Sequence, residues 1–417
     1  MFLSRDNVRD IDLTDEYDAV VIGGGPCGSF SASTAAKLGA KVLICEEHES
    51  VGISPHCTGH LNLNGLKRLR LYPLPENVVE NRFRGVTFHS PSGKEFSIRF
   101  NSPVTCVVNR ELFDKYLADL AMKVGVKYRV GARVESFILD KGSIKGVVVN
   151  QKELKETLSS KIVVDAEGIS SAVLRKTGLE SLDRSMIVNA VQVEMDKLNG
   201  VESDLVEVYL GEKYAPGFYA WIVPKQEGTA KVGLATNIGN PERYLHKLIH
   251  DHPVASPKLN KSKILRQSFH PISLGGPIPK TYHHGLLIVG DAASQVKPTT
   301  GGGVIFGLLC SRIAGEVANE AIKNNDFSGD FLSRYQSRWK TLIGFDLTAM
   351  RRLRIMLNSL SDKKIDRIIE LCARLEMDKV VKKHGDLDLE GASLIRMLGH
   401  PATFILAFYF VFSSFLY

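Results

Sequence analysis

The feature that most constrains this chain is a glycine-rich turn between an apolar run and a helix of small residues. The segment reads VVIGGGPCG over residues 20–28, and Gly23, Gly25 and Gly28 form a G-x-G-x-x-G pattern. The first glycine permits a tight turn, the second lets the backbone approach a pyrophosphate, and the third lets helix and strand pack closely. The following helix presents unpaired N–H groups to phosphates. The pattern therefore predicts a dinucleotide site; a structural glycine turn without ligand is the alternative.

The residues around this turn predict a complete βαβ unit. Expected strands at 19–22 and 41–45 flank a helix at 26–38, and Glu46 follows the second strand. A carboxylate at that position can accept hydrogen bonds from a ribose. We expect a helix at 110–124, a later helix from Gly302 onward, and further strands at 127–130, 136–139, 145–149, 161–165 and 286–289.

Composition limits the class of protein. With 417 residues, 44% hydrophobic and 24% charged, the chain is typical of a globular protein of more than one domain. Its six cysteines include no C-x-x-C pair, which argues against a zinc or iron–sulfur site and favours a reducing cytosol. His246 and His250 share a helix face at metal spacing, but no other ligand cluster stands near, so we expect no metal. The charged N-terminus predicts no signal peptide.

A second motif lies late in the chain. Residues 287–293 read LIVGDAA, and residues 298–303 read PTTGGG. Here the chain resembles the FAD enzymes of the para-hydroxybenzoate hydroxylase type. The resemblance implies FAD as cofactor, with Asp291 on the flavin ribitol chain and with Gly302 and Gly303 opening a helix beneath the isoalloxazine. Such a helix N-terminus would favour the negative charge of reduced flavin. A role for Asp291 as a turn residue alone is the alternative.

Two further elements carry the same resemblance. Residues 165–168 read DAEG and, with Ser171 and Arg175, resemble the family's A-D-G-x-x-S stretch, with Glu167 where aspartate is usual. Arg110 matches the arginine that such enzymes place near the FAD. The sequence has no second strand followed by G-x-G-x-x-G. We therefore expect no built-in nicotinamide domain and an external electron donor, either NAD(P)H, a ferredoxin or a similar carrier.

The order of these motifs predicts an α/β (α+β mixed) fold. It consists of a Rossmann-like FAD-binding domain, an inserted antiparallel β-sheet substrate domain and a helical C-terminal region. Residues 187–237 alternate in the manner of an antiparallel sheet. We assign the FAD-binding domain to 16–75, 101–180 and 276–330, the sheet domain to 76–100 and 181–275, and the helical region to 331–417.

A motif in the sheet domain narrows the reaction. Residues 216–225 read PGFYAWIVPK, which resembles the P-x-x-Y-x-W-x-x-P signature of the geranylgeranyl reductase family, with Val223 where phenylalanine is usual. That family also has a cysteine followed by two glycines, which here reads Cys57-Thr58-Gly59. The resemblance covers about residues 17–330. It implies hydrogenation of isolated double bonds in geranylgeranyl chains, on a diphosphate or on archaeal ether phospholipids.

This substrate implies roles for particular residues. An isoprenoid chain requires a long apolar tunnel, which Phe218, Tyr219 and Trp221 would line. We expect hydride to reach one alkene carbon and a proton the other, while the ring of Tyr219 or Trp221 eases the positive charge that develops. Cys57 is a candidate proton source or substrate-positioning residue. The plainer alternatives are sheet core for the two aromatic residues and a small buried hydrophobe for Cys57.

Other flavoprotein functions compete with this one. An FAD-dependent monooxygenase or halogenase acting on a hydrophobic substrate is the nearest. Halogenases carry a related W-x-W-x-I-P stretch, but its first tryptophan is Tyr219 here, and the nearest candidate for their lysine, Lys37, comes too early. A quinone-linked flavoprotein would need a four-cysteine cluster site late in the chain, where only Cys310 and Cys372 lie. A flavin-binding membrane protein without turnover is the remaining option.

The C-terminal part indicates contact with a membrane. The net charge is +7, and residues 351–383 hold ten basic side chains, which could face anionic lipid head groups or form an ordinary solvated surface. Residues 401–417 are uncharged but shorter than the ~20 residues that cross a bilayer. They could enter one leaflet or pack as a last core helix. We expect a cytoplasmic enzyme peripheral to the membrane, and no nucleic-acid partner.

Overall fold

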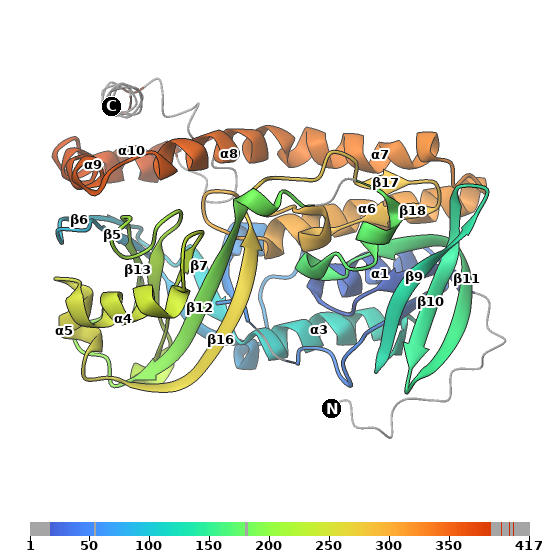
Figure 1. Ribbon diagram of the computed structural model, residues 1–417, viewed down its shortest axis with the longest axis horizontal. Helices are drawn as coiled ribbons and strands as arrows, with labels where there is room; N and C mark the ends of the chain where they lie inside the picture. Colours follow the sequence, from blue (N-terminus) through green and yellow to red (C-terminus); the bar gives the residue numbers. More distant parts are fainter. Residues whose placement is uncertain are drawn as a thin grey trace.

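The computed structural model describes residues 17–53, 56–179 and 182–384, together with 393, 400 and 403. Within these residues an eight-stranded sheet joins distant parts of the chain (Figure 1). Its strands are β1 (Tyr17–Ile22), β2 (Val42–Cys45), β8 (Lys127–Arg129), β9 (Ala132–Asp140), β10 (Ser143–Gln151), β11 (Leu154–Asp165), β17 (Tyr282–His283) and β18 (Leu286–Ile288). Strands β18, β11, β1, β2 and β8 run parallel in that order, so their carboxyl ends meet at one edge.

Helices cover this parallel sheet. They are α1 (Pro26–Lys37), α3 (Arg110–Lys123) and α6 (Val304–Asn324), and α1 packs against both of the others. The approach of α6 to α1 is close, since a Cβ at Gly315 would lie 2.5 Å from the carbonyl oxygen of Ser31. Gly315 on α6 thus lets the helix that follows the second motif pack closely against the helix that follows the glycine turn.

A seven-stranded sheet forms the second part of the molecule. It contains β5 (Gly85–His89), β6 (Glu95–Arg99), β12 (Ile187–Asp196), β13 (Leu205–Tyr209), β14 (Ala220–Pro224), β15 (Ala230–Thr236) and β16 (Lys263–Ser273). Neighbouring strands are antiparallel except β13 and β5. Helices α4 (Pro241–Asp251) and α5 (Ala255–Leu259) pack on one face of this sheet. The opposite face carries Trp221.

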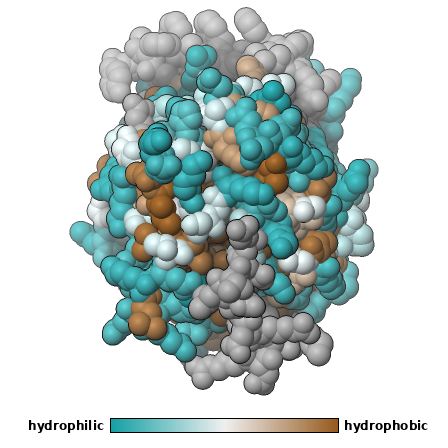
Figure 2. All heavy atoms as spheres, turned by 90° about the vertical axis from the view of Figure 1, so that its right-hand side faces the viewer, coloured by the Kyte–Doolittle hydropathy of each residue, from teal (hydrophilic) through white to brown (hydrophobic). Residues whose placement is uncertain are grey.

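A smaller sheet and the C-terminal helices complete the described fold. The sheet contains β3 (His60–Asn62), β7 (Thr105–Val108) and β4 (Val79–Phe83), and it is accompanied by α2 (Leu63–Arg68). The C-terminal helices are α7 (Gly329–Trp339), α8 (Phe345–Asn358), α9 (Asp362–Arg374) and α10 (Met377–His384). A π-helical turn (Lys340–Gly344) joins α7 to α8, and the two helices run along the top of the view in Figure 1. At the end of the molecule shown in Figure 2, hydrophobic residues lie in separate groups among hydrophilic ones.

The fold class expected from the sequence is confirmed, and the region after residue 327 is helical as far as it is described. One local expectation was wrong, because Arg354, one of the basic side chains of residues 351–383, is 3% exposed. Tyr219 directly precedes β14. The apolar segment 401–417 lies outside the described residues except for position 403. Among the described residues no helix is both long and apolar enough to span a bilayer. The domain boundaries stay a prediction.

Candidate active site

The glycine turn at the carboxyl end of β1 surrounds an open space. Gly23 has φ +91°, and a Cβ there would lie 2.5 Å from the carbonyl oxygen of Ala166. A Cβ at Gly28 would lie only 1.9 Å from the carbonyl oxygen of Gly23, so no larger residue fits. A Cβ at Gly25, in contrast, would meet nothing within 4 Å. Because no side chain caps the N-terminus of α1, its N–H groups face space that suits a pyrophosphate.

Glu46, at the end of β2, holds this turn in shape. Its carboxylate is 8% exposed and accepts a hydrogen bond from the Gly24 N–H at 2.7 Å. The other oxygen accepts from the His48 N–H at 2.9 Å and lies 2.6 Å from His48 Nδ1. The structure therefore places Glu46 beside the glycine turn, while its contact with a ribose stays a prediction.

The second motif reaches the same edge of the sheet. Asp291 lies in a short 3₁₀ turn that follows β18, two strands away from β1. Its Oδ1 lies 2.9 Å from where a Cβ of Gly303 would be, so this glycine leaves room for the carboxylate. Helix α6 begins directly after Gly303 without a side-chain cap, and Gly302 is exposed. Ligands of parallel α/β sheets bind at this edge, so the two motifs fit the two ends of one dinucleotide.

The third element differs in detail from the expected pattern. Asp165, at the end of β11, is fully buried, and its Oδ1 accepts from the Glu167 N–H at 3.0 Å. The Glu167 carboxylate in turn accepts from the N–H groups of Val173 and Leu174 at 2.9 and 2.8 Å. Burial raises the pKa of Asp165 well above its ordinary value, and the neighbouring Glu167 raises it further. The longer Glu167 side chain thus serves to bind the following turn.

Arg110 is the first residue of α3 and lies next to Cys57. Its guanidinium donates two hydrogen bonds of 3.0 Å to Asp114, one turn later on the same helix. Burial lowers the pKa of Arg110, but the Asp114 carboxylate and the adjacent Cys57 outweigh this effect and raise it. A fixed positive charge therefore stands beside the Cys57 thiol.

The loop that carries Cys57 is bound to the seven-stranded sheet. The Thr58 hydroxyl donates to Gln192 Oε1 on β12 at 2.6 Å, and Lys231 Nζ on β15 donates to the Thr58 carbonyl at 2.9 Å. Lys231 is 8% exposed and pairs with Glu80 at 2.6 Å. Burial lowers the pKa of Lys231, which the Glu80 carboxylate partly offsets. Thr58 therefore ties this loop to the sheet.

Trp221 joins the same network. Its indole N–H donates to Gln192 Oε1 at 3.3 Å, so the oxygen that accepts from Thr58 also accepts from Trp221. The ring lies over Gly233, where a Cβ would come within 2.6 Å of it. Gln192 thus joins Trp221 to Thr58, the residue that follows Cys57.

Tyr219 connects the sheet to the second motif. Its hydroxyl donates to the Thr300 carbonyl at 2.7 Å, and its ring stacks on Phe218 with centroids 4.2 Å apart. Arg354 from α8 holds the same segment, because its Nε donates to the Pro298 carbonyl at 3.0 Å. Its guanidinium also hydrogen-bonds the adjacent Thr299 carbonyl and lies 4.7 Å from the centre of the Phe218 ring.

Several of these residues were missed by reasoning from the sequence. Lys231 is a charged residue in the buried, largely apolar strand β15, a signal that could have found it. Gln192 lies in β12 among other polar residues, so the sequence offered no comparable signal for it. His56, next to Cys57, stacks on His270 with ring centroids 5.6 Å apart, and burial lowers the pKa of both imidazoles. His246 and His250 lie 4.2 Å apart on α4, and the described residues contain no metal-binding group of three or more ligands.

The glycine turn, the Asp291 turn and the free end of α6 define an FAD-binding flavoprotein. Residues 16–308 match the family model described as FAD binding domain, so the chain is an FAD-binding oxidoreductase. More narrowly, it belongs to the family of digeranylgeranylglycerophospholipid reductases. It is 34% identical over 379 residues to the reductase of Methanocaldococcus jannaschii, covering 89% of this chain and 95% of that one. A second reductase, from Methanopyrus kandleri, is 33% identical over 373 residues, or 88% and 93% of the two chains.

Solved structures agree with this assignment. A geranylgeranyl bacteriochlorophyll reductase-like protein from Thermoplasma acidophilum is 27% identical with a TM-score of 0.84, and the match covers 95% of this chain and 99% of that one. A flavin-dependent brominase is 19% identical with a TM-score of 0.72, covering 92% and 98%. The second likeness shows a common fold alone.

Proposed function

We propose that this protein is an FAD-dependent reductase that hydrogenates C=C bonds of geranylgeranyl chains, on archaeal ether phospholipids or on geranylgeranyl diphosphate. The observation that carries the proposal is the link through Gln192, which joins the Cys57 loop to Trp221 beside the flavin-binding edge. The relatives of this chain are named for reduction of such lipids, which supports the same reaction class here.

Different residues of the chain would bind different parts of FAD. The N-terminus of α1 at Gly25 would receive the pyrophosphate and Glu46 the ribose, while Asp291 would bind the ribitol chain. The α6 N-terminus at Gly302 and Gly303 would stabilise negative charge on the ring. When bound, FAD supplies the hydride.

The remaining groups act on the alkene. Tyr219 and Trp221 line an apolar site that excludes water and present ring faces to the carbon on which positive charge develops. Cys57 is the proposed proton donor to the other alkene carbon. Its neighbour Thr58 fixes the loop, because the Thr58 hydroxyl donates to Gln192 and its carbonyl accepts from Lys231. Arg110, adjacent to the thiol, stabilises the negative charge that is left when the proton departs.

Two partners belong to this proposal. The electrons come from an external donor, NAD(P)H or a ferredoxin, and the enzyme works at the membrane surface where its lipid substrate resides. Basic residues at the mouth of the site would bind the phosphate of the substrate.

Anaerobic incubation of the dithionite-reduced holoprotein with geranylgeranyl lipids tests the proposal. Products should gain mass in steps of two hydrogens without consumption of oxygen. Product that forms only with oxygen, and carries an added oxygen or halogen atom, would show that the protein is a monooxygenase or halogenase instead. Cys57→Ala should slow alkene reduction strongly while leaving FAD binding unchanged.

A further inference from the structure

The outer side of the C-terminal helices exposes large apolar side chains next to basic ones. Leu342, Phe345 and Ile355 are 42%, 55% and 48% exposed. Leu342 lies in the π-helical turn, and Phe345 and Ile355 lie on α8, where Arg351 and Arg352 are also exposed. These five residues are called the α8 face below. Exposed apolar residues that occur singly need no explanation, but a group of this kind marks an interaction site.

Helical spacing places three residues of the α8 face on one side of the helix. Phe345, Arg352 and Ile355 are separated by seven and three residues, which is the spacing of neighbours on one helix face. The other side of α8 is already occupied, because Leu347 and Met350 are 1% and 0% exposed in the core. The α8 face is therefore a second apolar surface, distinct from the one that anchors the helix.

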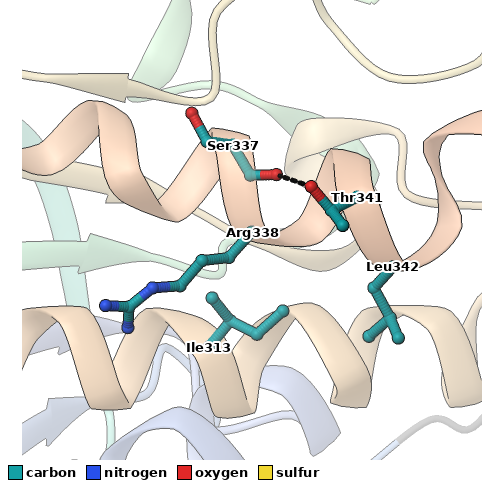
Figure 3. A pocket seen from close by; sticks show the side chains of 5 residues that line it. All are labelled: Ile313, Ser337, Arg338, Thr341 and Leu342. Carbon is teal, nitrogen blue, oxygen red and sulfur yellow. Dashed lines mark hydrogen bonds between the residues drawn. The ribbon is translucent and has the colours of Figure 1, made fainter.

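A hollow extends this face toward α6. Leu342 lines a shallow hollow of about 520 Å³ with Ile313 from α6 and with Ser337, Arg338 and Thr341 (Figure 3). Arg338 lies at its edge and pairs with Glu320 at 2.7 Å. The aliphatic side chains of Ile313 and Leu342 thus continue the apolar surface beyond the helix itself.

Within α8 and the π-helical turn before it, the exposed charges have one sign. Between residues 340 and 359 the acidic residue is Asp346, which is 5% exposed and so contributes little to the surface. Lys340, Arg351 and Arg352 are exposed. Basic side chains interspersed with exposed apolar ones suit an anionic lipid surface, where the bases meet phosphates and the apolar groups enter the acyl boundary. A second copy of the chain would bring like charges together across a twofold interface.

We propose that the α8 face docks this enzyme onto an anionic membrane surface. The proposal rests on the function proposed above, since a lipid substrate must be taken from a bilayer. The same helix contacts the candidate site on its buried side, where Arg354 donates to the Pro298 carbonyl of the segment that binds Tyr219. Helix α8 therefore lies between the docking surface and the segment that binds Tyr219.

Sedimentation of the full-length holoprotein with vesicles tests this proposal. The probes are phosphatidylcholine vesicles and vesicles that also contain phosphatidylglycerol. Two paired variants address the two kinds of contact, Arg351→Glu with Arg352→Glu and Phe345→Ser with Ile355→Ser. The matched control is Lys123→Glu with Lys127→Glu, an exposed basic pair at the end of α3 and the start of β8. Helix α3 lies across the molecule from α8 (Figure 1).

The native protein and the control pair should bind the anionic vesicles, and rising salt should weaken this binding. Each α8-face pair should lower vesicle affinity by about tenfold or more, since each exposed base and each buried apolar side chain contributes. FAD absorbance and reduction of a detergent-dispersed substrate should not change, which separates lost docking from lost folding. Unchanged vesicle binding in both α8-face pairs overturns the proposal, as does a native dimer that these variants dissociate. Failure of alkene reduction with normal vesicle binding would instead count against the proposed function.

Discussion

Replacement of Arg354 by methionine tests whether a buried cation on α8 holds the segment at residues 298–303. The variant keeps an apolar stem of similar length but removes the donors to the Pro298 and Thr299 carbonyls. A buried carbonyl left without a partner costs about 1–3 kcal/mol. Loss of the contact with the Phe218 ring costs about 0.5–2 kcal/mol more. We therefore expect the free energy of unfolding to fall by about 4 kcal/mol.

Denaturation in guanidinium chloride, read as the midpoint at constant slope, measures this change. Arg352→Met is the matched control, because this arginine is exposed two residues earlier on the same helix and should shift the free energy by no more than about 0.5 kcal/mol. FAD affinity of Arg354→Met should also fall, since the segment before α6 loses its anchor. A loss below about 1 kcal/mol would refute the reasoning, because it would mean that both carbonyls find other partners.

Three further predictions concern the glycine turn, the hydrogen bonds of Gln192 and the dependence of stability on pH. Gly25→Ala should keep the stability of the apoprotein but weaken FAD binding about tenfold or more in a fluorescence titration, whereas Gly28→Ala, with its Cβ 1.9 Å from a carbonyl oxygen, should lower stability itself by about 1–3 kcal/mol. Equal effects of the two substitutions would contradict this. Gln192→Leu should slow alkene reduction while dithionite still reduces the flavin at the native rate, and a matching loss in both steps would argue for general disorder. Burial lowers the pKa of His252 to about 4, and its Nδ1 accepts from two backbone N–H groups at 3.1 and 3.2 Å. The unfolded chain therefore binds a proton between pH ~6.5 and 4 that the folded chain does not, so stability should fall by about 3 kcal/mol as pH decreases through this window. His252→Asn should flatten that slope, and the exposed His246→Asn should leave it unchanged.

The sequence alone predicted those features in which the backbone or the packing admits one type of residue. Gly23 and Gly28 stand in contacts that exclude any Cβ, and the buried strands on either side of the turn fix the βαβ unit. Asp291 follows a buried strand in the same way. Apart from the approach of Ala166 to Gly23, these features depend on residues close together in the sequence, so a local pattern can predict them.

The tertiary structure decided which distant side chains meet. Thr58 and Gln192 are 134 residues apart, and Arg354 lies 56 residues from the carbonyl of Pro298 that it binds. Because Arg354 is charged, the sequence predicts that it is exposed to solvent. In the fold it is buried, because its guanidinium hydrogen-bonds two buried carbonyls and contacts an aromatic ring. The sequence by itself determined the dinucleotide turn and the flavin-binding scaffold. Only the folded chain determined how the cysteine loop is tied to the aromatic sheet, because that choice depends on packing between strands that no local pattern records.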